Sequence, residues 1–386
     1  MPKTEPVEGY QYDEGKRTIA KKYENAKLAM DFVNGILLLI SFCVFLFLSG
    51  ASSKLARVLS SLSGSYWISL WSYIVVFVIM LQLLTSPLAF YSGFVVDRRF
   101  QLSTQTIRGW IIEQFKGLGI ELVFGVLAGM MLYYLIANIR LWWIVAAGIF
   151  AVFSIILSTI LPFVILPIFY KVNPLSDPQL KDDLLEMTEK AGVGNIDRVL
   201  VADESRRSIR ANAFFSGVGK SRSIVLFDTL LSNFTHREIT TVVAHELGHY
   251  VNKDIWKEAL TSGILILPPF FVADIALRSA VAASSLTSMI DPSGVPLIFA
   301  VLIAATFALQ PVSNAISRRV ERKADEFALN VASDPDAQAS AERRLADLSL
   351  SVDRPSRLVE LLFYTHPPSS QRIKLTEDWK KHISVD

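Results

Sequence analysis

The sequence predicts a mainly α-helical, polytopic membrane protein whose spans surround a small cytosolic α+β domain. Three observations carry this prediction. Hydrophobic residues make up 52% of the 386 residues, which is more than an ordinary soluble domain contains. They are concentrated in runs long enough, or nearly long enough, to cross a bilayer. One long polar stretch between these runs instead shows the alternating and amphipathic patterns of a folded soluble region.

We expect about six membrane spans. The six apolar runs are 32–48, 67–90, 117–139, 142–169, 259–275 and 295–311. Two acidic residues, Glu121 and Asp274, fall inside these runs, where a charge indicates either a functional group or a side chain that reaches water near a span end.

The distribution of Lys and Arg predicts the orientation. Six of these residues precede the first span, and the next three loops carry two, four and one. The charged segment 1–27 lacks the short n-region and cleavage site of a removable signal peptide, so we expect a retained tail. The positive-inside rule then places both termini, and the polar stretch after the fourth span, in the cytosol.

Composition also excludes several classes of protein. The single cysteine, Cys43, lies in the first predicted span, so neither a disulfide framework nor a cysteine zinc site is expected. A net charge of +2 indicates no nucleic-acid partner, and basic loops beside a lipid bilayer explain the clustered cations.

The soluble region begins after the fourth span. We predict a helix over 177–191, ended by two glycines, and strands over 198–202 and 223–227 with a third candidate at 212–215. The predicted division is a tail with a four-span membrane region at 1–170 and a second region at 171–386, which includes spans five and six and a cytosolic C-terminal segment.

A helix with a metal-binding motif follows these strands. Thr235 and Glu238 satisfy the capping-box pattern and predict where the helix begins. His245-Glu246-Leu247-Gly248-His249 is an HExxH motif, and its i, i+4 spacing places both imidazoles on one helical face, where they can share a zinc ion. Glu246 lies beside that metal, where it can take a proton from water and pass it to a leaving amine. These residue types predict peptide-bond hydrolysis.

A catalytic zinc site needs a third protein ligand. His236 stands at the helix start and is expected to face elsewhere, whereas His366 and His382 remain open as ligands. Glu321 is the better candidate, because we expect it to begin an amphipathic helix directly after span six, at the same membrane face. Asp325 lies one turn later on that face, where its carboxylate can accept the N–H of a zinc-bound imidazole. Two histidines, one glutamate and a water complete such a shell.

These segments together resemble a known family. The HELGH motif, Glu321-Arg322-Lys323-Ala324-Asp325, and Thr365-His366-Pro367-Pro368 followed by Arg372 resemble the integral-membrane gluzincins of the type I CAAX prenyl protease family. The stretches at 212–217 and 223–231 are similar to the segment that precedes the zinc helix in that family. The likeness covers roughly residue 21 to the C-terminus.

The resemblance implies a fold and a set of roles. It implies helices that enclose a large chamber and cage a cytosolic zinc-metallopeptidase domain with one zinc ion per chain. His245, His249 and Glu321 are then the zinc ligands, Glu246 the general base and acid, and Asp325 the partner of a zinc-bound imidazole. Asn212 would lie on an edge strand that pairs with an extended substrate. The resemblance also implies that His366 and Arg372 contact the oxyanion or the substrate backbone near the cleft.

Two departures bear on the substrate. The extra N-terminal span and the long charged insertion of eukaryotic members are absent from this chain, which matches a compact bacterial or archaeal member. The expected activity is that of a zinc-dependent membrane endopeptidase acting on CAAX-type or other membrane-associated proteins and peptides, prenylated or not.

Three other functions remain open at this stage. One is membrane quality control of the HtpX-like type, and a second is a non-catalytic membrane clamp or chaperone scaffold. The third is an intramembrane protease of the site-2 type; such a protease would bury HExxH within a span, whereas here charged residues flank the motif.

Overall fold

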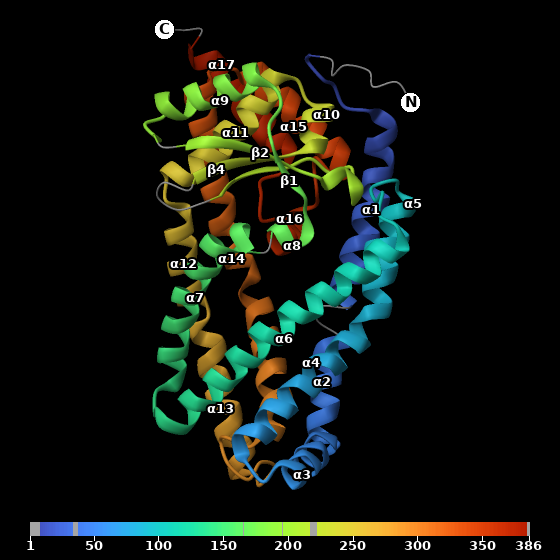
Figure 1. The fold of residues 1–386 in the computed structure, drawn as a ribbon, viewed down its shortest axis with the longest axis vertical. Coiled ribbons are helices and arrows are strands. Elements are labelled where there is room, and N and C mark those ends of the chain that lie inside the picture. The colour runs from blue at the N-terminus through green and yellow to red at the C-terminus, as the bar shows by residue number, and fades with distance from the viewer. Residues whose placement is uncertain (1–7, 34–37, 165, 195, 217–221, 384–386) are drawn as a thin grey trace.

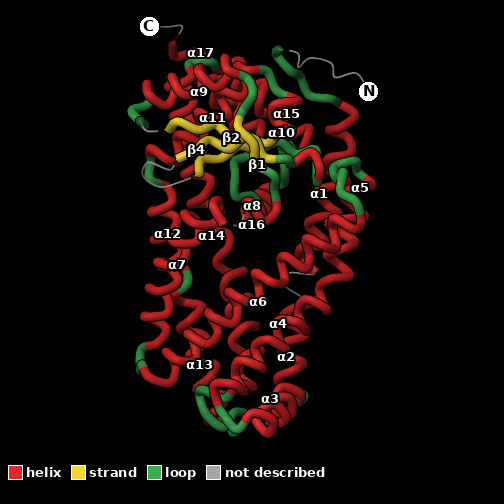
Figure 2. Tube along the Cα trace, viewed as in Figure 1, coloured by secondary structure: helices red, strands yellow, loops and turns green. Residues whose placement is uncertain are grey.

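The computed structural model describes residues 8–33, 38–164, 166–194, 196–216 and 222–383. Long helices form an elongated frame, and a small sheet with shorter helices gathers at the end where both termini lie (Figures 1 and 2). This arrangement confirms the predicted fold class of a mainly helical membrane protein with a small α+β domain.

The longest described helices are α1 (Glu14–Phe32), α4 (Tyr66–Phe90), α6 (Ile107–Asn138), α7 (Trp142–Val164) and α14 (Val295–Ala332). The shorter α13 (Leu267–Ala282) directly follows α12 (Asp254–Leu265) in the chain. The shorter elements that link or extend them in the first half of the chain are α2 (Leu39–Leu48), α3 (Ala51–Ser63), η2 (Tyr91–Val96), α5 (Asp97–Arg99) and α8 (Leu166–Phe169). Those of the second half are α9 (Pro178–Lys190), η3 (Glu204–Arg206), α10 (Asp228–Asn233), α11 (His236–Val251), α12 (Asp254–Leu265), η5 (Pro292–Gly294), α15 (Pro335–Ser349), α16 (Arg357–Phe363) and α17 (Ser369–Ile383).

Where the structure describes them, all six predicted apolar runs lie largely in helices; residues 34–37 of the first run and 165 of the fourth lie outside the described residues. Among the described residues, four helical segments are long and apolar enough to cross a membrane: 66–99, 107–138, 254–282 and 292–332. A fifth is obtained if α2 and α3, which meet at a bend of 69°, count as one span. The apolar part of α7, Trp142–Ile156, is too short to count as a span by the same test.

The break expected before Glu321 is wrong. A single 38-residue helix, α14, runs from Val295 through Glu321 to Ala332. Pro311 lies inside it without ending it, which membrane helices tolerate. Beyond Pro311 the helix holds no further proline and no glycine, and its many Ala, Arg, Glu and Lys residues favour continued helix. Glu321 is therefore connected rigidly to a membrane span.

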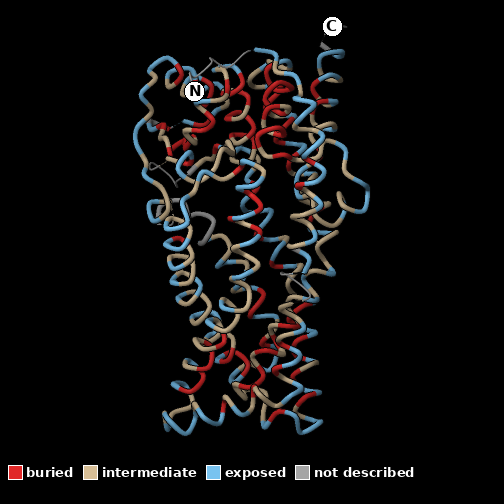
Figure 3. Tube along the Cα trace, turned by 90° about the vertical axis from the view of Figure 1, so that its right-hand side faces the viewer, coloured by how far each residue is buried: buried red, intermediate tan, exposed pale blue. Residues whose placement is uncertain are grey.

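Buried residues gather toward the two ends of the molecule (Figure 3). In three of the four spanning segments only 17% of the most apolar window is buried. The chamber that the family resemblance implies stays a prediction.

Asp274 in α13 is buried, where it accepts a hydrogen bond from Trp142 Nε1 at 2.7 Å and pairs with Arg278. Glu121 is exposed on α6.

The sheet has four strands in the order β1-β2-β4-β3. They are β1 (Val172–Pro174), β2 (Ile196–Ala202), β3 (Ala213–Ser216) and β4 (Arg222–Phe227). β2 and β4 are parallel, and the other two pairs are antiparallel. The three predicted strands are confirmed, whereas β1 was not predicted. β3 is an edge strand, and side chains of α9, α11 and the sheet form one apolar core.

Candidate active site

The helix that carries HExxH is fixed at its start by the predicted capping box. The backbone N–H of Glu238 donates to Thr235 Oγ1 at 3.3 Å, and that of Thr235 donates to Glu238 Oε2 at 2.8 Å. The other oxygen of Glu238, which is buried, accepts from Ser340 and Arg344 of α15. The cap therefore both starts α11 and attaches it to α15.

Close packing of α11 on α14 brings the motif to Glu321. A β-carbon at Gly248 would lie only 3.1 Å from the Cα of Ala324, so the missing side chain permits this approach. Glycine lowers the helix propensity of α11 at this position, but a residue without a β-carbon lets the backbones of α11 and α14 approach each other closely.

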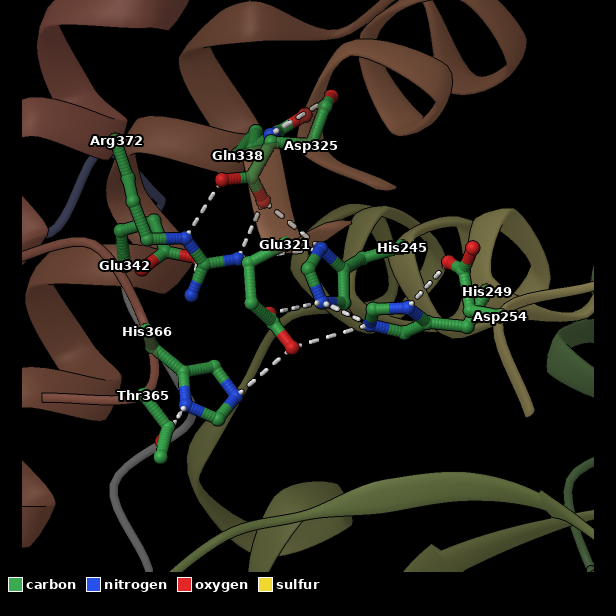
Figure 4. Close-up of polar contacts among 10 residues, drawn as sticks. All are labelled: His245, His249, Asp254, Glu321, Asp325, Gln338, Glu342, Thr365, His366 and Arg372. Carbon is green, nitrogen blue, oxygen red and sulfur yellow. Dashed lines mark hydrogen bonds and ion pairs between the residues drawn. The ribbon is translucent and has the colours of Figure 1, made fainter. Parts of the chain in front are cut away.

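His245, His249 and Glu321 converge on one point (Figure 4). Their candidate ligand atoms all lie within 4.8 Å of one another. The Nε2 atoms of the two histidines are 3.2 Å apart, and carboxylate oxygens of Glu321 lie 3.3 Å and 3.5 Å from them. Glu321 Oε2 is buried and no N–H or O–H group donates to it, so its lone pairs are left for a metal ion to coordinate. This His-His-Glu donor set fits a catalytic zinc ion.

Two carboxylates orient the imidazoles. Asp325 Oδ1 lies 2.8 Å from His245 Nδ1, and Asp254 Oδ2 lies 3.0 Å from His249 Nδ1. Each contact favours the tautomer that leaves Nε2 free to ligate a metal. Asp325 stands where the sequence predicted it. Asp254 was missed, because it lies beyond the helix end and reaches His249 only through a left-handed turn at Lys253.

Arg372 lies beside the metal-binding helix and bonds two carboxylates. Its Nε donates to Asp325 Oδ2 at 2.8 Å, and its Nη1 lies 2.9 Å from Glu342 Oε1. The guanidinium therefore holds the carboxylate behind His245. It also borders the cavity beside Glu246, so a substrate contact stays a prediction.

Glu246 lines a cavity of about 170 Å³ that Asn212 and His366 also border. Burial raises the pKa of the Glu246 carboxyl above its ordinary value. A raised pKa suits a group that accepts a proton from water and then returns it to a leaving amine near neutral pH.

His366 lies between α16 and α17, and its Nε2 is 3.3 Å from Glu321 Oε1. The other histidines lie elsewhere. His236 pairs with Asp177, and His382 bonds the backbone of Asp378 on α17. Neither belongs to the metal-binding group found among the described residues.

Asn212 directly precedes the edge strand β3. Its backbone carbonyl accepts from Phe227 N at 3.0 Å, and its side-chain Oδ1 accepts from Ala213 N at 2.9 Å. Asn212 also lines the cavity beside Glu246. The free edge of β3 and this side chain together suit an extended peptide.

Comparisons with known proteins agree with this geometry. Residues 174–380 match the model of peptidase family M48, and residues 6–171 match the CAAX prenyl protease N-terminal model, described as five membrane helices. That is one more helix than the four spans predicted for residues 1–170.

Curated relatives and a solved structure are similar over most of the chain. CAAX prenyl protease 1 of Saccharomyces cerevisiae is 30% identical, over 74% of this chain and 67% of the relative. The uncharacterized metalloprotease YhfN of Bacillus subtilis is 28% identical over 93% and 85%. The crystal structure of S. mikatae Ste24p has a TM-score of 0.79 at 25% identity, covering 94% of this chain and 88% of that one.

Proposed function

The chain belongs to peptidase family M48 and carries the membrane region of the CAAX prenyl proteases, and we propose that its peptidase activity depends on one zinc ion. His245, His249 and Glu321 hold this ion. The protein is an integral-membrane metalloendopeptidase that acts on peptide or protein substrates. We further propose that its substrates are CAAX-type chains, which the name of the yeast relative indicates, or other membrane-associated chains.

The convergence of two imidazoles and one carboxylate from α11 and α14 carries this proposal (Figure 4). Each of the three is held by a packed helix, and both imidazoles have a carboxylate partner on Nδ1. Such support around the ligands is typical of a functional metal site.

The roles of the residues follow from their positions. When bound, zinc supplies a Lewis acid that activates water and polarises the substrate carbonyl. Glu246 accepts the proton of the attacking water at its carboxylate and delivers it to the leaving amine. Asn212 and the free edge of β3 hold the peptide extended, and His366 contributes a donor where negative charge develops on the cleaved carbonyl.

The site and the termini are proposed to face the cytosol. The Lys and Arg distribution supports this orientation, and the termini lie at the same end of the molecule as the sheet and α11 (Figure 1).

Glu246→Gln tests the function. The variant keeps the size of the side chain and all three candidate ligands, so zinc content should stay near one ion per chain. Peptidase activity of the detergent-purified protein on prenylated and unprenylated peptides should fall roughly 10²- to 10⁴-fold. Activity equal to wild type would refute the role of Glu246. Rescue of a deletion phenotype by this variant would instead favour the membrane clamp.

A further inference from the structure

The helix that supplies Glu321 also holds the segment that carries His366. This histidine follows α16 in the loop before α17, and its Nε2 comes within 3.3 Å of Glu321 Oε1 (Figure 4). Two further polar side chains of α14, Asn314 and Arg318, bond the same segment. Their hydrogen bonds explain how the position of the imidazole is fixed.

Asn314 is buried on α14, two turns before Glu321. Its Nδ2 donates to the backbone carbonyl of Leu362 at 2.8 Å and to that of Leu361 at 3.3 Å. Both carbonyls belong to the last turn of α16, where a helix leaves its carbonyls without a partner of its own. The buried amide supplies the missing donor and attaches the end of α16 to α14.

Arg318 extends this attachment one turn closer to Glu321. Its Nη1 donates to the carbonyl of Glu360 at 3.0 Å and to that of Tyr364 at 2.6 Å. Its side chain is only 16% exposed, so little water competes for these bonds. Tyr364 already lies beyond α16, two residues before His366. Arg318 therefore fixes the backbone of the loop where it leaves the helix.

Little freedom remains between this anchor and the imidazole. Only Thr365 separates Tyr364 from His366, and Thr365 Oγ1 lies 2.9 Å from His366 Nδ1. The two residues after His366 are prolines, whose rings fix the backbone φ. The remaining ring nitrogen, Nε2, is the one that lies beside Glu321.

The spacing along α14 places the anchors and the metal ligand on one face. Asn314, Arg318, Glu321 and Asp325 follow one another at intervals of four, three and four residues, which is the repeat of a single helical face. α14 is unbroken over this stretch. One rigid helix therefore sets the position of His366 relative to Glu321.

We propose that Arg318 is a positioning residue for His366, with Asn314 as its support, and that it holds the imidazole where negative charge develops on the cleaved carbonyl. The inference rests on the proposed function, because it concerns the donor that His366 supplies in that mechanism. Such a donor acts in the transition state and contributes little to binding of the intact peptide. Loss of its position therefore lowers kcat and leaves the affinity for the peptide nearly unchanged.

A double-mutant cycle tests this role in the full-length, zinc-loaded protein with a peptide that the wild type cleaves. His366→Ala should lower kcat about 10²- to 10³-fold, the usual effect of losing one oxyanion donor. Arg318→Met, which removes both hydrogen bonds at similar size, should lower kcat about 10²-fold because the imidazole is displaced. The double variant should be no slower than His366→Ala alone, since Arg318 acts through a residue that is already gone.

Further measurements separate positioning from general damage. Arg318→Lys, whose ammonium keeps three donors on a long stem, should recover most of kcat. In Arg318→Met the zinc content should equal that of wild type, and the dissociation constant of the peptide, measured with Glu246→Gln also present, should change less than about threefold. Arg319→Met makes the same chemical change on the next residue of α14, which is exposed, and should leave kcat at the wild-type level. Asn314→Leu replaces Arg318→Met in the cycle if that variant does not fold.

The outcomes distinguish the two proposals. If the effects of Arg318→Met and His366→Ala multiply in the double variant, or if Arg318→Met keeps the wild-type kcat, the positioning role is overturned while the peptidase mechanism stands. A wild-type kcat in His366→Ala overturns the role of His366 and the positioning with it. Failure of the proposed function itself shows instead as full activity of Glu246→Gln.

Discussion

Replacing Gly248 by alanine tests whether the contact between α11 and α14 assembles the metal site. The added methyl group would lie 3.1 Å from Ala324 Cα, 3.2 Å from Ala324 O and 3.2 Å from Phe327 Cβ. Two of these atoms belong to the backbone of α14, so no side-chain rotation relieves the contact. Ordinary contacts begin at 3.4 Å, so the helices must separate by at least about 0.3 Å at this point.

That displacement acts directly on the ligands. Glu321 lies one turn from Ala324 on α14, and His245 and His249 flank Gly248 on α11. Zinc sites tolerate ligand displacements of about 0.2 Å. We therefore expect zinc affinity to fall about tenfold, equivalent to about 1.4 kcal/mol. Overpacking should also cost about 1–3 kcal/mol of stability.

The sign of the stability change makes this prediction diagnostic. Inside a helix, Gly→Ala without a steric conflict stabilises by about 0.5–1 kcal/mol, so a loss identifies the interhelical contact. Zinc affinity is measured by competition with a chelator, and stability by thermal unfolding in detergent. Gly119→Ala on α6, where a β-carbon meets no heavy atom within 4 Å, is the matched control. Wild-type affinity together with raised stability in Gly248→Ala would refute the reasoning.

Two further predictions concern buried acids. Asp254→Asn should weaken zinc binding about ten- to a hundredfold, because an amide holds the His249 tautomer less firmly than a carboxylate does. Chelator competition measures this effect, and Lys257→Met, which removes only the cation on the other oxygen of Asp254, should leave affinity near wild type. Trp142→Phe should lower stability by about 1.5–3 kcal/mol in thermal unfolding, because Asp274 loses a buried hydrogen bond. Trp143→Phe, which alters a ring contact with Phe271, should cost less, and equal losses would argue against the bond to Asp274.

Local patterns predicted much of the fold. The capping box at Thr235, the short apolar run of β4 and the apolar spans each depend on residues close in sequence, so their patterns are visible in the chain itself. β1 escaped prediction because it has three residues and contains a proline. The break expected before Glu321 was wrong because a change from apolar to charged residues marks the edge of the membrane but does not end a helix.

The sequence by itself determined the chemistry of this protein. The i, i+4 spacing of the HExxH motif, and the same spacing of Glu321 and Asp325, place each pair on one helical face wherever the helices lie. Their residue types and the apolar runs around them were sufficient to predict a membrane protein with a zinc-binding, peptide-hydrolysing site.

Only the tertiary structure decided how these faces meet. The packing of α11 on α14 at Gly248 sets the distances between the imidazoles and Glu321, and the turn at Lys253 brings Asp254 to His249. Arg372 and Glu342, from two further helices, complete the polar network behind His245 and the wall beside Glu246. These contacts join residues far apart in the chain, and their geometry follows from the packing of side chains between helices, which no local pattern encodes.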